Sequence, residues 1–268
     1  MTAGRPSPDN EQRPLLLVTN DDGVYAPGLL ELRRALEPVG EVAILAPEHN
    51  WSAAGHTKTM HKPLRVNEAQ LSDGSPALVA SGTPSDCVAL ALLGILDRQP
   101  DLVLSGINLG ANVGHDLTYS GTVAAAMEAV IWGVPGLAIS LDTFEPASFA
   151  VAARFAAHLA DHVLRERLPY PLLLNVNVPA RPAERIAGVR ITRLGRRIYR
   201  DALVTRRDPR GRPYYWIGGE PPSGHAEPGT DIGALAEGHI SVTPVRLDLT
   251  DHEQIARLES WALTFPLA

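Results

Sequence analysis

The sequence predicts an α/β protein with a doubly wound, mostly parallel sheet, followed by extended C-terminal β-arm elements and a terminal helix. Between residues 14 and 180, short apolar runs that suit buried strands alternate with segments whose apolar residues recur at helical spacing. Strands that alternate with helices favour a parallel sheet with right-handed crossovers. After about residue 180 the alternation stops, and a sequence rich in Arg, Gly, Pro and aromatic residues favours extended arms.

The first elements predict a β-α-β unit. Residues 15–19 form a continuous apolar run of the kind found in fully buried parallel strands. Pro27 suits the first turn of a helix over 28–36, in which leucines recur at helical spacing opposite charged residues. A second strand is expected at 42–46.

The same alternation predicts the rest of the core. Further strands are expected at 77–80, 102–105, 136–141 and 172–176, with further helices at 84–96, 122–132 and 147–165. A strand at 239–247 and a helix at 251–263 are expected near the C-terminus. We therefore divide the chain into a disordered tail at 1–13, a core at 14–180, and C-terminal arms, strand and helix at 181–268.

The composition is that of a globular protein with a small acidic excess. The chain has 268 residues, with 24 Lys+Arg, 30 Asp+Glu and a formal net charge of −6, which argues against a general nucleic-acid-binding protein. No apolar run approaches the roughly 18 residues that a membrane span needs, and the first residues contain no apolar signal segment. The single cysteine, Cys87, excludes an internal disulfide and a cysteine-cluster metal site. We expect a cytoplasmic protein.

The charge is unevenly distributed along the chain. Between Arg181 and Arg212 there are eleven Arg and three acidic residues, so this stretch is strongly basic and the remainder is correspondingly acidic. Two interpretations stay open for the basic stretch. It forms a solvated arm surface, or it lines the approach of an anionic substrate, on this chain or on a neighbouring subunit.

Polar clusters follow several of the expected strands, where a parallel sheet places its ligand. Asp21 and Asp22 come directly after the first strand, and two adjacent carboxylates can hold a hard divalent cation. The alternative is a turn with helix-capping aspartates. A polar loop after the second strand carries Ser52, which either contacts substrate or lies in an exposed connector.

Two further motifs suit an anionic ligand. Asn108 and Asn112 lie in a Gly-rich segment after the strand at 102–105, although that segment matches neither a P-loop nor the dinucleotide-binding fingerprint. Ser120, Gly121 and Thr122 begin a helix, where free N–H groups meet phosphate oxygens. A Gly/Asn surface loop and simple N-capping are the respective alternatives.

Together these motifs resemble the SurE family of stationary-phase survival proteins, which are metal-dependent nucleotidases. The resemblance extends from about residue 14 to residue 250, with the motifs in the family's order. They are Val18–Gly23 (VTNDDG), Trp51–Gly55 (WSAAG), Ser81–Val88 (SGTPSDCV), Ser105–Gly114 (SGINLGANVG), Tyr119–Thr122 (YSGT), Thr230-Asp231, and Ser241–Pro244 (SVTP) with Asp248 following.

The resemblance implies a Rossmann-like catalytic core and one divalent metal ion per subunit, Mg²⁺ or Mn²⁺. The implied metal ligands are Asp21, Asp22, Ser52 and Asn108. It also implies hydrolysis of nucleoside 5′- and 3′-monophosphates, with some members trimming short polyphosphate. The family's C-terminal elements exchange between subunits, so the implied assembly is a homodimer or homotetramer.

Carboxylate, hydroxyl and amide oxygens are ligands that suit Mg²⁺ or Mn²⁺. We expect water to attack phosphorus in line, with Asn112, Ser120, Gly121 and Thr122 binding the phosphate oxygens. Asp21 or Asp22 acting as nucleophile or base remains an alternative. No histidine pair has zinc-binding spacing on a helix, and the acid that protonates the leaving group stays open.

One alternative function is a non-catalytic nucleotide- or phosphate-binding protein that keeps the loops without turnover. Another is an α/β hydrolase or dehydrogenase, which is weakened by the absence of G-x-S-x-G and G-x-G-x-x-G. No membrane and no nucleic-acid polymer is expected as a partner. Neither the base preference nor the 5′ versus 3′ preference follows from the sequence.

Overall fold

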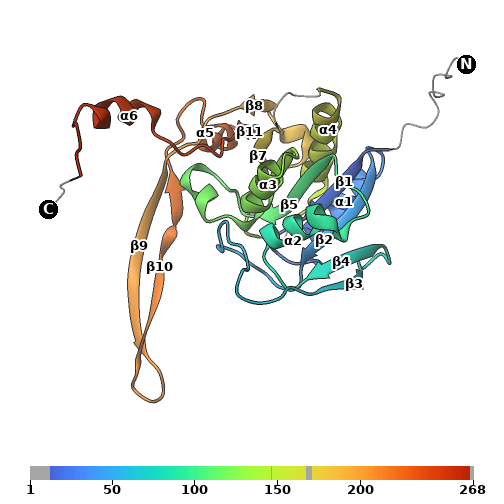
Figure 1. The fold of residues 1–268 in the computed structure, drawn as a ribbon, viewed down its shortest axis with the longest axis horizontal. Helices are drawn as coiled ribbons and strands as arrows, with labels where there is room; N and C mark the ends of the chain where they lie inside the picture. The colour runs from blue at the N-terminus through green and yellow to red at the C-terminus, as the bar shows by residue number, and fades with distance from the viewer. Residues whose placement is uncertain (1–12, 146, 167–170, 266–268) are drawn as a thin grey trace, which may run out of the picture.

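A computed structural model describes residues 13–145, 147–166 and 171–265 (Figure 1). The tail expected at 1–13 lies outside the described residues, except for Arg13. Within the described residues no helix is both long enough and apolar enough to cross a membrane.

The described residues place nine strands in one sheet, in the order β3-β4-β2-β1-β5-β6-β7-β11-β8. Neighbouring strands are parallel except for β3 against β4 and β11 against β7, which confirms the mostly parallel sheet. The strand bounds are β1 Leu15–Thr19, β2 Glu41–Pro47, β3 Val66–Gln70, β4 Pro76–Ala80, β5 Leu102–Leu109, β6 Gly136–Asp142, β7 Leu173–Pro179, β8 Val189–Ile191 and β11 Ile240–Pro244.

Helices cover both faces of this sheet, which confirms the doubly wound arrangement. The helices α1 (Pro27–Leu36) and α4 (Ala150–Glu166) share one buried cluster with Leu16 and Val18 of β1. The helices α2 (Pro84–Leu90) and α3 (Gly121–Ile131) contact each other and share a second cluster with Leu17. Successive residues of β1 therefore face opposite layers, as the side-chain alternation of a strand requires.

Several element boundaries differ from the sequence-based expectation. β5 continues to Leu109 instead of ending at 105, so Asn108 is the second-to-last residue of the strand and does not lie in a free loop. The helix expected at 84–96 is α2 followed by a π-helical turn, η2 (Ala91–Ile95), in which Gly94 has φ +120°. α4 begins three residues later than expected and β11 is shorter.

The short elements β3 and α5 (Asp231–Ala236) were not expected from the sequence. β3 lies at the sheet edge and is mostly exposed, so it carries no apolar run. α5 has six residues, one of them glycine, which is too short for a helical period to be recognised.

The chain after residue 180 is divided between the sheet and an arm. β8 and β11 join the main sheet, whereas β9 (Arg197–Arg207) and β10 (Pro213–Gly224) form an antiparallel hairpin that projects away from the body (Figure 1). The short 3₁₀ turns η3 (Gly114–Thr118) and η4 (Ala183–Arg185) lie in connections. The terminal helix α6 (His252–Glu259) has no buried residue.

Candidate active site

The two predicted carboxylates lie at the carboxyl end of β1. The side chain of Asn20 closes the turn, because its Nδ2 donates to the Gly23 carbonyl at 2.9 Å and its Oδ1 accepts from the Gly23 N–H at 3.2 Å. Gly23 has φ +103°, a conformation that favours glycine. The turn therefore holds Asp21 and Asp22 at the edge where the parallel strands end.

Asp21 is buried against the start of α3. Its Oδ1 accepts a hydrogen bond of 2.5 Å from Thr122 Oγ1, and the Asp21 side chain is 4% exposed. A Cβ atom on Gly121 would lie 2.8 Å from the Asp21 Cβ, so only glycine allows this close approach. The start of α3 and the Asp21 carboxylate therefore pack closely, although they lie about a hundred residues apart in the sequence.

The loop after β2 meets the same pair of carboxylates. Asn50 Nδ2 donates to Asp22 Oδ1 at 3.2 Å, and Asn50 Oδ1 accepts from the Ser52 N–H at 2.8 Å. The Trp51 N–H donates to the Asp21 carbonyl at 2.7 Å. Ser52 is exposed and lines the same cavity as Asp21, so the structure brings this predicted residue to the site.

The two asparagines predicted from the Gly-rich segment have different surroundings. Asn108 lines the cavity, and its Nδ2 donates to the Gly110 carbonyl at 2.8 Å, so its amide oxygen is the atom left for a cation. Asn112 is 8% exposed, and its Nδ2 donates to Ser140 Oγ at 2.8 Å. Its backbone carbonyl accepts from Asn175 and Asn177. Asn112 thus donates to groups within the protein, and it ties the segment after β5 to β6 and β7.

Ser120 and Thr122, at the start of α3, have different roles. Ser120 lines the cavity, and its Oγ accepts from the Val123 N–H at 3.1 Å, so it is the N-cap of α3. Thr122 has no exposed surface, and its hydroxyl is used by Asp21. The N-capping alternative therefore holds for Ser120, while the side chain of Thr122 positions a carboxylate.

Five of the predicted residues, Asp21, Ser52, Asn108, Asn112 and Ser120, line one cavity of about 460 Å³, whereas Asp22, Gly121 and Thr122 lie outside its lining. Its lining comprises Asp21, Ser52, Ala53, Asn108, Leu109, Gly110, Ala111, Asn112, Asp116, Tyr119, Ser120, Phe144, Arg197 and Tyr199. A larger cavity of about 790 Å³ lies along β2, β3 and β4, but among the described residues Glu68 is the one charged side chain in its lining. We take the smaller cavity as the candidate site because Asp21 lines it together with Ser52, Asn108 and Ser120, a convergence of polar groups that the larger cavity does not have.

The electrostatics of the carboxylate pair suit a cation. Burial raises the pKa of Asp21, and burial together with the charge of Asp21 raises the pKa of Asp22 to about 6. Within the described residues neither carboxylate has a cationic side chain among the groups that shift its pKa. Two carboxylates, a hydroxyl and an amide oxygen are hard donors, so the residues present fit Mg²⁺ or Mn²⁺.

Other metal sites find no support in the part of the chain that the structure describes. There, no group of three or more His, Cys, Asp or Glu side chains could hold a metal ion. Cys87 is buried in the cluster under α2, and burial, with a contribution from Asp86, raises the pKa of its thiol. It is therefore an inert core residue rather than a ligand or nucleophile.

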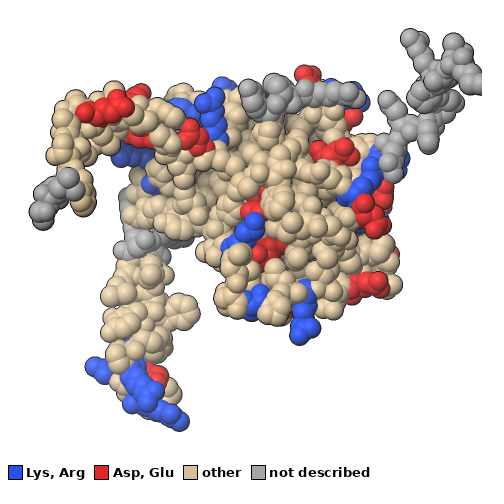
Figure 2. Space-filling view, in the orientation of Figure 1, with Lys and Arg blue, Asp and Glu red and all other residues tan. Residues whose placement is uncertain are grey.

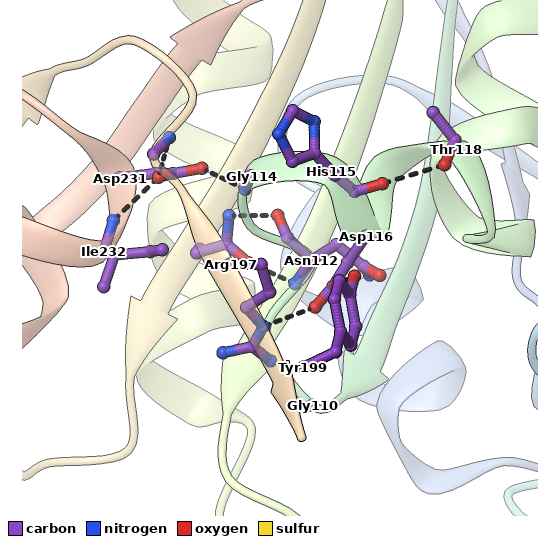
Figure 3. A network of polar contacts seen from close by, with 12 residues as sticks. Gly110, Asn112, Gly114, His115, Asp116, Thr118, Arg197, Tyr199, Asp231 and Ile232 are labelled. Atoms are coloured by element: carbon purple, nitrogen blue, oxygen red, sulfur yellow. Dashed lines mark hydrogen bonds and ion pairs between the residues drawn. The ribbon is translucent and has the colours of Figure 1, made fainter. Parts of the chain in front are cut away.

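One wall of the cavity comes from the Arg-rich stretch, for which the sequence left open a place near an anionic substrate without indicating a particular residue. Asp116 accepts hydrogen bonds from Arg197 Nε at 2.7 Å and from the Tyr199 hydroxyl, which ties the base of β9 to η3 (Figure 3). Asp231 accepts from the Gly114 N–H at 2.8 Å and from the Gly195 N–H at 2.7 Å beside it. Arg197 and Tyr199 lie in the Arg-rich stretch, where no local pattern distinguishes a site residue from a surface residue.

Comparison with known proteins shows to which family this chain belongs. A family model described as "Survival protein SurE" matches residues 16–201. The chain belongs to the SurE family. A protein named 5′-nucleotidase SurE from Chloroflexus aggregans is 58% identical over 248 residues, covering 92% of this chain and 98% of that relative. A protein of the same name from Herpetosiphon aurantiacus is 55% identical over 91% of this chain and 97% of its own length.

A solved SurE structure confirms the fold. The crystal structure of the SurE protein from Aquifex aeolicus matches with a TM-score of 0.80 and 39% sequence identity, covering 93% of this chain and 100% of that one. The resemblance drawn from the ordered motifs is therefore confirmed at the level of family and fold. The SurE match includes β1, the loop with Ser52, β5 and the start of α3, which are the segments that build the cavity.

Proposed function

We propose that this SurE-family chain is a 5′-nucleotidase, an enzyme that hydrolyses nucleoside monophosphates to nucleoside and phosphate. Relatives named 5′-nucleotidase SurE match more than nine-tenths of the chain. The observation in the structure that carries the proposal is the buried Asp21 carboxylate, which lines the cavity beside the start of α3 and has the half-buried Asp22 next to it. Hydrolysis of 3′-monophosphates and of short polyphosphate stays a prediction, as does the cytoplasmic location.

The chain's oxygen donors support a divalent cation at this site. Asp21, Asp22, Ser52 and Asn108 would hold one Mg²⁺ or Mn²⁺ per chain, and the ion supplies Lewis-acid polarisation of a phosphate oxygen when bound. The loop contact between Asn50 and Asp22 keeps Ser52 beside the carboxylates. Thr122 fixes the orientation of Asp21, so the pair is arranged before any ligand enters.

The other residues of the cavity receive the phosphate and guide the reaction. Ser120 lines the cavity at the N-terminal end of α3, where the first backbone N–H groups of a helix favour an anion. Arg197 also lines the cavity, where its guanidinium is paired with Asp116 and offers its remaining N–H groups to an anion. We propose that water attacks phosphorus as the bond from phosphorus to the ester oxygen breaks. The ester oxygen takes the electron pair of that bond and a proton, and the attacking water gives up one proton. The developing negative charge is then shared by these donors.

A substrate panel crossed with a metal panel tests the function. Phosphate release is expected from AMP and GMP with Mg²⁺ or Mn²⁺ and is expected to stop when the cation is removed with EDTA. Asp161→Asn on the exposed face of α4 serves as a control variant that keeps full activity. No release from any phosphate ester with any divalent cation would overturn the proposal. Nucleotide binding without release would favour the non-catalytic alternative.

We also propose that copies of the chain associate through the β9–β10 hairpin. Leu203, Trp216 and Ile217 are 67%, 64% and 83% exposed, and Ile217 pairs with Leu203 across the strands. An isolated two-stranded hairpin is at best marginally stable in water, and exposed apolar residues mark interaction surfaces. Figure 2 shows Lys and Arg gathered at the hairpin's tip, where Arg206, Arg207, Arg210 and Arg212 lie. These charges suit an acidic partner surface.

Shortening the hairpin tests this assembly. Replacing residues 204–216 with Asn-Gly joins Leu203 to Ile217 by a two-residue turn and leaves Arg197 and Tyr199 in place. Light scattering is expected to give a dimer or tetramer for the full chain and a smaller mass for the shortened one. A monomeric full chain, or an unchanged mass after shortening, would contradict the role of the hairpin.

A further inference from the structure

Three aromatic side chains border the candidate active-site cavity. Tyr119 follows η3, Phe144 follows β6, and Tyr199 lies in β9, so three separate segments bring them to one rim. They are 62%, 75% and 41% exposed, respectively. Large exposed aromatic side chains that gather at one cavity indicate a ligand with an apolar, flat part.

Phe144 is held against the backbone at the end of β5. A Cβ atom on Gly110 would lie 2.6 Å from Phe144 Cε1, so the ring packs directly on Gly110. Gly110 has φ +105°, which an L side chain rarely adopts, so both its conformation and its neighbour require glycine. Gly110 is two residues along the chain from Asn108, and Phe144 and Asn108 line the same cavity.

Tyr199 is oriented by a polar contact at its far end. Its hydroxyl donates to Asp116, which also accepts from Arg197 Nε (Figure 3). Burial, the hydrogen bond to Asp116 and the charge of Asp116 raise the pKa of Tyr199 to about 12, so the phenol stays neutral toward an anionic ligand. The ring is thus fixed on the wall that faces the cavity.

The cavity therefore has two chemically different parts. Asp21, Asn108 and Ser120 supply the polar part, where the phosphate belongs under the proposed function. The aromatic rim supplies the other part. A volume of about 460 Å³ lies within the range of small-molecule sites, which is about 300–1,000 Å³.

We infer that the rim is a nucleobase subsite, in which the base of a nucleoside monophosphate stacks on Phe144, with Tyr119 and Tyr199 lining the same cavity. This inference rests on the proposed function and names the part of the substrate that the aromatic rim binds. Every base has a π-face, so stacking selects for the presence of a base more than for its identity. The subsite therefore predicts similar KM values for AMP, GMP, CMP and UMP.

The test compares AMP with ribose 5-phosphate, which has the same phosphate and sugar but no base. In Phe144→Ala the KM for AMP is expected to rise about tenfold, since stacking on an aromatic side chain contributes that much or more per base. The kcat/KM for ribose 5-phosphate is expected to stay unchanged. Phe144→Tyr keeps a ring and is expected to restore the wild-type KM, whereas Phe144→Leu keeps apolar bulk without a ring and is expected not to.

The outcomes separate the subsite from the activity. Equal losses for AMP and ribose 5-phosphate would overturn the subsite, because the ring would then act only on the shared part of the substrate. Full activity of Phe144→Leu on AMP would overturn it as well. If the wild-type enzyme hydrolyses neither compound, the proposed function fails. If it hydrolyses both with the same KM, only the subsite fails.

Discussion

Asp21→Asn is expected to lower kcat/KM for nucleoside monophosphates by at least about 10²-fold, because cation-assisted charge stabilisation contributes several kcal/mol at 1.36 kcal/mol per tenfold. The asparagine keeps an oxygen that accepts from Thr122, but it removes one of the two negative charges that attract a divalent cation. The measurements are phosphate release from AMP and calorimetric titration of the protein with Mn²⁺.

The same substitution separates catalysis from folding. Asp21 is 4% exposed and its pKa is raised by burial, so removing the charge relieves a desolvation cost and should not lower the free energy of unfolding. Asp161→Asn on α4 is the matched control, because Asp161 forms only a surface pair with Arg165. An Asp21→Asn protein that keeps activity within about threefold of wild type would refute the role of Asp21 in catalysis. A threefold change is less than the tenfold step that corresponds to 1.36 kcal/mol.

Glu128→Gln is expected to lower the free energy of unfolding by about 2 kcal/mol at pH 7, because it removes the charge of a buried carboxylate that holds three hydrogen-bonding side chains. Glu128 lies on α3 with its side chain 2% exposed. It contacts Lys58 Nζ at 2.6 Å and His56 Nε2 at 2.9 Å, and it accepts from Trp132 Nε1 at 2.7 Å. His56 and Lys58 belong to the loop that carries Ser52, so this variant should also weaken Mn²⁺ binding.

The pH dependence of this effect follows from the carboxyl group of Glu128. Burial acts to raise its pKa, but hydrogen bonds from His56, Lys58 and Trp132 lower it to about 2 from 4.5. The stabilisation is therefore complete above pH 4.5 and is lost as the pH falls toward 2. Urea unfolding of both proteins at pH 7, 4 and 3 should show the difference shrinking with acidity.

A surface carboxylate provides the control for this second prediction. Glu41 pairs with Arg98 at 2.9 Å, but its side chain is 63% exposed, so Glu41→Gln is expected to change the free energy of unfolding by less than about 1 kcal/mol. If Glu128→Gln and Glu41→Gln had equal stability, the buried cluster would not hold the loop on α3. A difference that did not change with pH would argue against the Glu128 carboxylate as its source.

Much of the fold follows from local sequence patterns. The apolar run of β1 and the regularly spaced leucines of α1 indicate which residues are buried. The structure has both elements within one residue of the expected bounds. β3 was missed because an edge strand needs no apolar run, and the extension of β5 was missed because its end carries Gly and Asn. The predicted end of a strand is wrong where pairing with a neighbouring strand extends the strand beyond its apolar residues.

The sequence by itself determined which segments carry the site. Asp21 and Asp22 follow β1, Ser52 lies in the loop after β2, and Asn108 lies near the end of β5, so the order of the parallel strands brings these segments to one edge of the sheet. Motif order was also enough to predict the SurE family, because each motif lies within a few residues of sequence.

Only the tertiary structure decided what each side chain does there. It directs the Asn112 donor to Ser140 and the Thr122 hydroxyl to Asp21, and it closes the cavity with Arg197 and Tyr199 from the hairpin base. These contacts join residues that lie 28 to more than a hundred positions apart. Strand and helix periodicity reports whether a residue is buried, whereas its hydrogen-bond partner depends on how distant elements pack.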